Sequence, residues 1–434
     1  MRAAYTFDLK HLRGDIYGGL TAGVVAIPLA LAFGVASGLG PMAGMYGAII
    51  VGFFAAWLGG TPTNVSGPTG PMVVVLAGLF ASLSGDVGLI LTAVVLAGVF
   101  QIIFGLIKLG DFIGLVPYPV VSGFMSGIGV IIIILQLDAT LGHMAPAGTI
   151  SALQYLPTAL TDINMSALAV AMVTLIVVYG WPTTWGKYFP AALAALSAGT
   201  LVSLFMSGIP VLGEIPSGLP SFHMPIFEQS AMMLVIEAAF ILAVLGAIDS
   251  LLTSLVADNM TRTRHDSNQE LIGQGIGNTV AGLFGGIAGA GATMRTVVNI
   301  RSGGHTKISG MIHSVVLAAV VLGLGPIAAH IPHAALAGVL IKVGLDIIDF
   351  SYLRNAHRGP RWDLALMALV LGLTVLVDLI TAVGAGVVLA ALAYVKQVAK
   401  AQLDDLQSRP LTATTEEERD LVEALKDRVT VFEF

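Results

Sequence analysis

The chain contains no cysteine and few charged residues. Without cysteine it can form no disulfide, no thiolate metal site and no cysteine nucleophile. Only 11% of its 434 residues are charged, whereas soluble domains have about 25%. The net charge is −6 and no block of basic residues is present, so we expect no nucleic-acid partner. These shortages argue against a soluble enzyme or a nucleic-acid-binding domain.

What the chain has instead is apolar sequence. Apolar residues make up 56% of it and the mean hydropathy is +0.90. This composition gives more apolar surface than a soluble fold of this length can bury. A helix needs roughly 20 apolar residues to cross a bilayer, and stretches near that length recur along the chain. We therefore expect an all-α polytopic membrane protein. The expected long spans are 16–36, 42–58, 87–107, 112–135, 166–180, 189–206, 231–256, 270–285, 306–324, 331–348, 364–380 and 382–399.

Two further apolar segments, 69–84 and 292–301, are too short to span a membrane. Each follows a break rich in glycine or proline, at 66–71 and 285–291. Counted with the long spans they are the third and tenth of fourteen segments, which predicts two halves of seven. Short, interrupted segments at matching places in two halves are typical of a transporter's binding site.

The positive charges indicate the orientation. Lysine and arginine lie in the N-terminal segment, in the tail and in alternate loops, whereas the loops 136–165 and 208–230 contain none. Cytoplasmic loops carry the excess of these residues, so we expect both termini in the cytoplasm, which an even number of spans requires. The first apolar run is long and more spans follow it, so it is not a cleavable signal peptide. We expect a multi-pass protein of a bacterial cytoplasmic membrane.

The composition changes after Lys400. Residues 1–400 are the expected transmembrane transport domain, while 401–428 are polar and charged and 429–434 alternate like a strand. A lone strand has no partner for its backbone groups. We expect 401–434 to be a cytoplasmic linker and the start of a further domain.

Asp249 is the clearest candidate for function. It lies inside the apolar run 238–257, where a charged residue costs about 2.5–3.5 kcal/mol on insertion scales. Thr253 follows four residues later and shares its helical face. Carboxylate, hydroxyl and carbonyl oxygens suit a hard cation such as Na⁺, or a proton relay. The alternative is a carboxylate paired between helices for structure.

The two breaks are candidates for an anion site. A half-helix that starts at mid-membrane presents unpaired N–H groups and a positive dipole end, so two facing ends can bind an anion. Thr69 is a plausible N-cap, and Pro71 fits the first turn. Gly291 and Ala292 allow close approach of the backbone, and Thr293 adds a hydroxyl. The alternative is that these small residues serve tight helix crossing.

Arg295 lies in the first turn of the second half-helix. A cation there opposes the helix dipole. It therefore needs a nearby anion, which would be a substrate, Asp249 or both. The alternative is an arginine whose head reaches the membrane interface.

The chain resembles the SulP (sulfate permease) family of anion transporters over essentially its whole length, and within it the sodium-dependent bicarbonate carriers. Several stretches carry the resemblance, the longest around the second break. They are Arg13–Thr21, Gly59–Thr63, Pro68–Met72, Ser122–Gly127, Ile248–Thr253, Glu270–Gly275, Leu283–Met294 and Ser302–Gly304.

The resemblance implies a seven-plus-seven inverted repeat whose half-helices, segments 3 and 10, meet at mid-membrane. It implies a core that moves against a gate in an elevator-like alternating-access cycle. It also implies a following STAS domain, of which 401–434 is the start and through which a homodimer is expected. The anion-binding positions it implies are Thr69 and Ala292, and the sodium-binding positions are Asp249, Thr253, Gly291 and Thr293. Gly70 and Arg295, which lie in the first turns of the two half-helices, are our further candidates for substrate binding.

Two departures leave the ions open. The sodium-coupled bicarbonate carriers have an acidic residue at the place of Gly67 and a small one at the place of Arg295. We expect Na⁺-coupled bicarbonate uptake with no cofactor. The alternatives are a proton-coupled or exchanging carrier of sulfate or a dicarboxylate and, less in keeping with nearly unbroken apolar spans, an anion channel. An intramembrane enzyme would need a nucleophile–base pair or a metal cluster, and the sequence shows neither.

Overall fold

The computed structural model describes residues 11–113, 118–143, 149–182, 184–185, 189–212, 220–355, 361–376 and 395. These residues are almost entirely helical, as the sequence predicted. The first half contains α1 (Leu12–Ala36), α2 (Pro41–Leu58), α3 (Gly70–Ser82), α4 (Val87–Leu106), α5 (Gly110–Ile113), α6 (Tyr118–Thr140), α7 (Thr149–Thr161), α8 (Met165–Gly180) and α9 (Ala191–Ser203). The second contains α10 (Met232–Thr261), α11 (Ser267–Leu283), α12 (Thr293–Arg301), α13 (Lys307–Ala328), α14 (His333–Ile347), α15 (Phe350–Asn355) and α16 (Arg361–Leu376).

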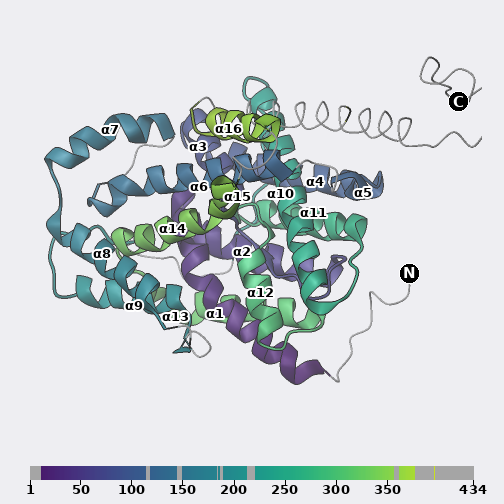
Figure 1. The fold of residues 1–434 in the computed structure, drawn as a ribbon, viewed down its shortest axis with the longest axis horizontal. Helices are drawn as coiled ribbons and strands as arrows, with labels where there is room; N and C mark the ends of the chain where they lie inside the picture. Colours follow the sequence, from purple (N-terminus) through teal and green to yellow (C-terminus); the bar gives the residue numbers. More distant parts are fainter. Residues whose placement is uncertain are drawn as a thin grey trace, which may run out of the picture.

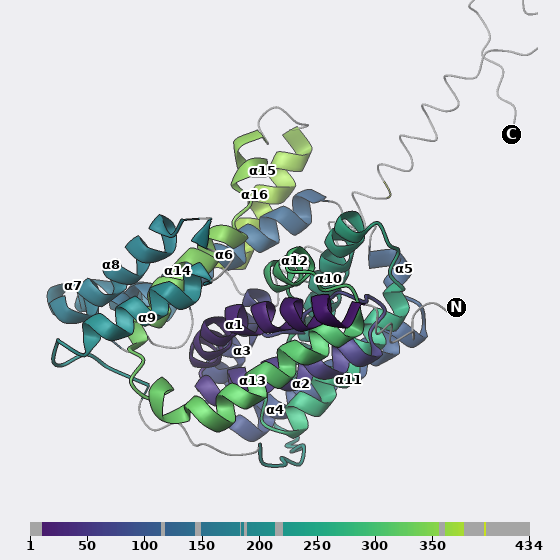
Figure 2. The same ribbon diagram turned by 90° about the horizontal axis from the view of Figure 1, so that it is seen from below.

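The helices gather in two groups. In one, α11 packs on α4 and α2, α1 packs on α13, and α10 packs on α4. In the other, α14 packs on α6 and α8, and α8 packs on α9. Figures 1 and 2 both show α7, α8, α9 and α14 on one side and α2, α4 and α11 on the other. We call the first group the core bundle (α1–α4 and α10–α13) and the second the gate bundle (α6–α9 and α14–α16).

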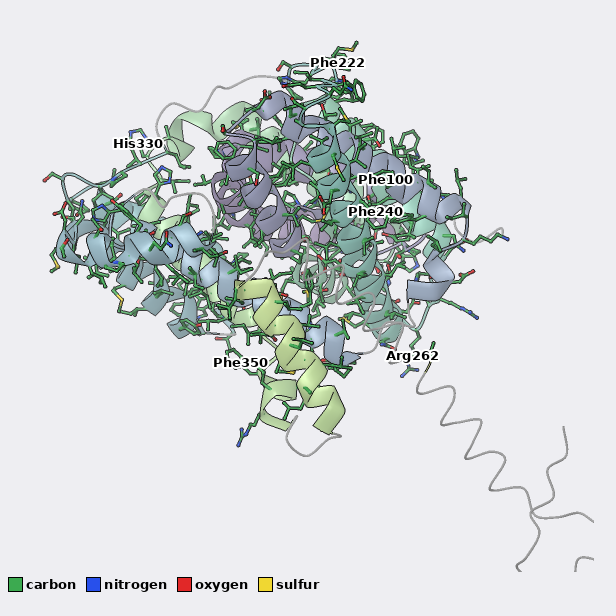
Figure 3. The ribbon with its side chains drawn as sticks, turned by 90° about the horizontal axis from the view of Figure 1, so that it is seen from above. Phe100, Phe222, Phe240, Arg262, His330 and Phe350 are labelled. Atoms are coloured by element: carbon green, nitrogen blue, oxygen red, sulfur yellow. The ribbon has the colours of Figure 1, made fainter. Side chains whose placement is uncertain are left out.

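Small residues and aromatic edges let the core helices approach closely. A Cβ atom placed on Gly98 of α4 would lie 2.4 Å from the backbone nitrogen of Thr279 on α11, so only glycine permits this crossing. Phe100 of α4 meets Phe240 of α10 edge to face, with ring centroids 6.0 Å apart (Figure 3). The core bundle is therefore held by direct helix contact rather than by long side chains.

Five of the described helices are long and apolar enough to cross a membrane by length and composition. They are α1, α2, α4, α6 and α10. Shorter apolar helices include α3, α9 and parts of α13 and α16. The expected last span, 382–399, lies outside the described residues apart from residue 395, and so does the whole expected linker, 401–434, so fourteen spans remain a prediction.

Two expected boundaries were wrong. Most of the span expected at 112–135 lies in α6, which is described from Tyr118 and continues to Thr140. The expected loop 136–165 contains α7, which is bent by 116° against α8. Asn164 starts α8, since its side chain accepts a hydrogen bond from the backbone of Ala167 (3.1 Å).

Candidate functional site

The two interrupted segments meet in the core bundle. Just before α3 lies β1 (Ser66–Gly67), and just before α12 lies β2 (Ala290–Gly291). These strands pair antiparallel, Ser66 opposite Gly291 and Gly67 opposite Ala290. Such a pairing satisfies backbone groups that have no helix to bond within. It also brings the start of α3 next to the start of α12, as the sequence predicted for a pair of half-helices.

The start of α3 has the features expected of an anion site. Thr69 is the N-cap residue in extended conformation, and proline follows in the first turn. The Thr69 hydroxyl is buried and does not cap α3, since it lies toward the carboxylate of Asp249. Ala292 occupies the N-cap position of α12, where no side chain caps either. Both ends therefore keep N–H groups without intrahelical partners, and Thr69 adds a hydroxyl that no cap uses.

The four predicted sodium-binding residues lie on α10, at the end of β2 and at the start of α12. The Thr253 hydroxyl donates to the carbonyl oxygen of Gly291 (3.0 Å) and lies 2.8 Å from the hydroxyl of Thr293. Asp249 is one turn before Thr253 on α10. Its carboxylate lies beside the Thr69 hydroxyl and close enough to Arg295 for their charges to interact. The structure thus brings three of these residues into contact and the fourth beside the start of α3. Hard oxygen ligands of this kind suit Na⁺.

Arg295 does not reach the membrane interface. Its side chain is 2% exposed, and its Nη2 donates to the carbonyl oxygen of Pro68 (2.6 Å). A Cβ placed on Gly67 would lie 2.6 Å from Arg295 Nη1. The guanidinium therefore occupies the space that a side chain at position 67 would fill. Within the described residues, Asp249 and Arg295 form no ion pair in this conformation, which leaves a substrate as the other anion expected beside the guanidinium.

Sequence reasoning missed the polar residues that hold β2. Asn278 of α11 pairs with both backbone groups of Gly289, accepting from its nitrogen (2.8 Å) and donating to its oxygen (2.9 Å). Ser250, next to Asp249, accepts from the nitrogen of Gly291 (3.0 Å). A signal existed, since asparagine and glutamine inside apolar spans need partners. Across the part of the chain that is described, no three His, Cys, Asp or Glu side chains gather as for a transition metal.

A cavity of about 540 Å³ lies between the two bundles. Leu252 of α10 forms its core side, and residues of α6, α14 and α15 form its gate side. Ile347 lines this cavity, and its Cδ1 would lie 2.9 Å from a Cβ placed on Gly70. Ile132 of α6 is equally close to that position, at 2.8 Å. The cavity therefore extends to the residues that cover the start of α3.

Comparisons with known proteins agree with this geometry. The model of the sulfate permease family matches residues 12–370. The chain belongs to the sulfate permease family. It is therefore a membrane transporter of anions and not an enzyme.

Within the sulfate permease family, two similar proteins are named bicarbonate transporter BicA. The one from Picosynechococcus is 47% identical over all of this chain and 80% of its own length. The one from Synechocystis is 46% identical over 94% of this chain and 74% of its own length. A solved structure, the transmembrane domain of a cyanobacterial BicA, matches with a TM-score of 0.84 and 48% identity, covering 88% of this chain and all of the other. The fold and the transporter class predicted from the sequence are confirmed.

Proposed function

We propose that this chain takes up bicarbonate together with Na⁺ across a bacterial cytoplasmic membrane. The observation that carries the proposal is the junction of α3 and α12, where two helix N-termini meet beside the carboxylate of Asp249. The bicarbonate transporters at 46–47% identity support this choice of anion. No cofactor is expected.

The anion would lie between the half-helices. Thr69 and Gly70 would contribute a hydroxyl and an N–H group from α3. Ala292, whose own N–H donates to Val65, would place the N–H groups of the first turn of α12 beside the anion. Arg295 would add positive charge from its buried position beside Pro68. Helix N-termini stabilise anions in this way without a contacting cation, which suits a site that must also release its substrate.

Sodium would bind beside the anion. Its ligands would be the Asp249 carboxylate, the hydroxyls of Thr253 and Thr293 and the carbonyl oxygen of Gly291. The Thr253 hydroxyl lies 3.0 Å from the Gly291 carbonyl oxygen and 2.8 Å from the Thr293 hydroxyl, which supports this choice of ligands. A bound cation would raise the affinity for the anion, because charges interact strongly where little water is present. This proximity is the proposed basis of coupling.

Transport would follow from a movement of the core bundle against the gate bundle. The proposed substrate and cation residues all belong to the core bundle, whereas Ile132 and Ile347 of the gate cover the start of α3. A shift of one bundle past the other would open the site to alternate sides. We further propose cytoplasmic termini and a homodimer formed through a STAS domain that begins within 401–434.

The test is uptake by purified protein in liposomes. Labelled bicarbonate, sulfate and fumarate are compared with and without an inward Na⁺ gradient. The proposal expects bicarbonate uptake that the gradient accelerates. Uptake of sulfate or fumarate that does not depend on Na⁺ would overturn it in favour of an exchanging or proton-coupled carrier. That function is the second candidate because Arg295 already supplies a buried positive charge.

We predict that Thr69→Val lowers the apparent affinity for the transported anion about tenfold, the value of one hydrogen bond of roughly 1–1.5 kcal/mol. The change removes a buried hydroxyl that does not cap α3, at nearly constant volume. The matched control is Thr174→Val on α8, whose hydroxyl bonds within its own helix (2.9 Å). KM is measured for each protein in liposomes. Equal KM values for the parent and Thr69→Val would leave Thr69 a structural role only.

Arg295 should weaken the dependence on sodium. Its permanent charge lies near Asp249 and disfavours a second cation there. We predict that Arg295→Gly lowers the half-saturating Na⁺ concentration roughly fivefold, since a unit charge about 8 Å away is worth roughly 0.5–2 kcal/mol at effective dielectric constants between about 80 and 20. Arg295→Lys keeps the charge and should keep the parent's curve. Bicarbonate uptake against Na⁺ concentration is the measurement, and superimposable curves for the parent and Arg295→Gly would refute the prediction.

A further inference from the structure

Glu270 is a buried carboxylate to which the proposed function assigns no task. It lies in the first turn of α11 and is 0% exposed. Its Oε2 accepts hydrogen bonds from the backbone nitrogens of Gly60 and Thr61, both at 2.9 Å. Its Oε1 accepts from the side chains of Asn64 (2.7 Å) and Gln274 (2.9 Å). Three of the four donors belong to the segment that joins α2 to β1, so the carboxylate is bonded mainly to this segment.

Lys307 holds the same segment from the other side. It is the first residue of α13 and is 7% exposed. Its Nζ donates to the carbonyl oxygens of Trp57 (3.2 Å) and Gly59 (2.7 Å) at the end of α2. A cation at the C-terminal end of a helix is favourable. We call residues 57–61 at the end of α2 the 57–61 turn. The Glu270 carboxylate binds N–H groups of this turn and the Lys307 ammonium binds its carbonyl groups, so together they fix the orientation of the peptide planes in the turn.

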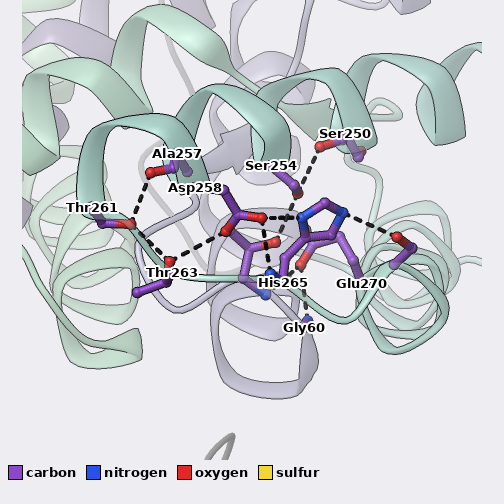
Figure 4. A network of polar contacts seen from close by, with 11 residues as sticks. Gly60, Ser250, Ser254, Ala257, Asp258, Thr261, Thr263, His265 and Glu270 are labelled. Atoms are coloured by element: carbon purple, nitrogen blue, oxygen red, sulfur yellow. Dashed lines mark hydrogen bonds and ion pairs between the residues drawn. The ribbon is translucent and has the colours of Figure 1, made fainter. Parts of the chain in front are cut away.

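The turn is connected to the proposed cation site. The Thr61 hydroxyl lies 2.7 Å from that of Ser254 on α10, and Ser254 donates to the carbonyl oxygen of Ser250 (2.9 Å). Ser250 in turn accepts from the nitrogen of Gly291. Figure 4 shows Glu270 and Gly60 beside Ser254 and Ser250. A displacement of the turn would therefore reach β2 through two serines of α10.

The turn is also connected to the proposed anion site. Asn64 accepts from the hydroxyl of Thr296 on α12 (3.0 Å), and that same hydroxyl accepts from the nitrogen of Val65 (3.0 Å). The carbonyl oxygen of Val65 accepts from the nitrogen of Ala292 (3.0 Å). Four residues further along the chain, Thr69 starts α3. The position of the start of α3 relative to the start of α12 is therefore set by where the 57–61 turn is held.

We infer that Glu270 and Lys307 are positioning residues for anion binding. By holding the 57–61 turn between opposite charges, they keep the start of α3 in place. The N–H groups of α3 and those of α12 then face the same anion. Sites of this kind lose affinity when their groups shift by about 0.5–1 Å. The inference rests on the proposed anion site between the half-helices, although it does not depend on which anion is carried.

The experiment is a kinetic comparison in liposomes, with whichever anion the parent protein takes up. Glu270→Gln keeps the size of the side chain but turns an NH₂ group toward donors that need an acceptor. We expect its KM for the anion to rise about tenfold, since hydrogen bonds to a charged group are lost. A structural role would lower the yield and thermal stability of the protein, and with them Vmax, while leaving the KM of the folded fraction unchanged.

Two further variants keep the test decisive. Lys307→Met removes the ammonium from the same turn and should also raise KM, and the double variant should lose less than the sum of the two single effects. Asp258→Asn is the matched control, a change from carboxylate to amide on α10 whose hydrogen bonds go to Thr263 and His265. If Glu270→Gln does not fold, Lys307→Met carries the test.

KM values within twofold of the parent in both folded variants, or an equal rise in Asp258→Asn, would overturn the inference. If the parent takes up an anion other than bicarbonate, or ignores Na⁺, the proposed function fails while the positioning test still stands.

Discussion

Replacing Asp249 by asparagine should abolish Na⁺-driven uptake while leaving the protein folded. The amide keeps the shape of the side chain and removes the charge that would hold the cation. The charge pair concerned is Asp249 with the bound Na⁺, and removing one partner of a buried charge pair costs about 3–5 kcal/mol. Since each 1.4 kcal/mol is a factor of ten, uptake driven by a Na⁺ gradient should fall below about 1% of the parent rate. Initial rates in liposomes measure the effect, and thermal unfolding in detergent checks the fold.

The control for this prediction is Asp86→Asn. Asp86 starts α4, where its carboxylate accepts from the backbone of Leu89 (3.1 Å). Asparagine is as good an N-cap as aspartate, so uptake and stability should match the parent. Normal Na⁺-driven uptake by Asp249→Asn would show that Asp249 is a structural carboxylate and that the cation binds elsewhere.

Gly289→Ala should strongly damage transport. A Cβ at this position would lie 2.5 Å from the carbonyl carbon of Gly67 and 2.7 Å from its oxygen. Both are backbone atoms, so β1 would have to move away from β2 and the two half-helices would separate. We expect transport to fall more than tenfold, with a destabilisation of about 1–3 kcal/mol typical of overpacking.

Gly78→Ala is the matched control. Gly78 lies within α3 and a Cβ there would meet nothing within 4 Å. Alanine favours the helix over glycine by about 1 kcal/mol, so this variant should transport normally and unfold at an equal or higher temperature. Wild-type transport by Gly289→Ala would show that the pairing of β1 and β2 tolerates a shift and does not set the site.

The half-helices were predictable because their signals are local. Glycine and proline at 66–71 and 285–291 mark the breaks, and the structure starts α3 and α12 at Gly70 and Thr293, within one residue of the expected starts. Asp249 was equally visible as a carboxylate in an apolar run. Its closeness to Thr69 is not local, because it depends on how α10 packs against both breaks. The resemblance to a known family supplied that expectation, and the structure places Thr253, Gly291 and Thr293 in contact as expected.

Other features could not be predicted because they depend on partners far apart in the sequence. The bond between Glu270 and Gly60 joins residues 210 positions apart. The direction of Arg295 depends on the free space beside Gly67, which no periodicity reveals. Helix α7 was missed because its residues are less apolar than those of a membrane span. For Glu270 and Arg295 the deciding interaction is tertiary, so the local pattern carried no information about it.

The most direct test of the account is whether the two ions help each other to bind. Bicarbonate affinity of the purified protein is measured by calorimetry at Na⁺ concentrations from zero to saturation, and Na⁺ affinity is measured with and without bicarbonate. The account predicts that Na⁺ raises bicarbonate affinity, that bicarbonate raises Na⁺ affinity by the same factor, and that Asp249→Asn removes both effects. Bicarbonate affinity that is the same at every Na⁺ concentration in the parent would contradict it.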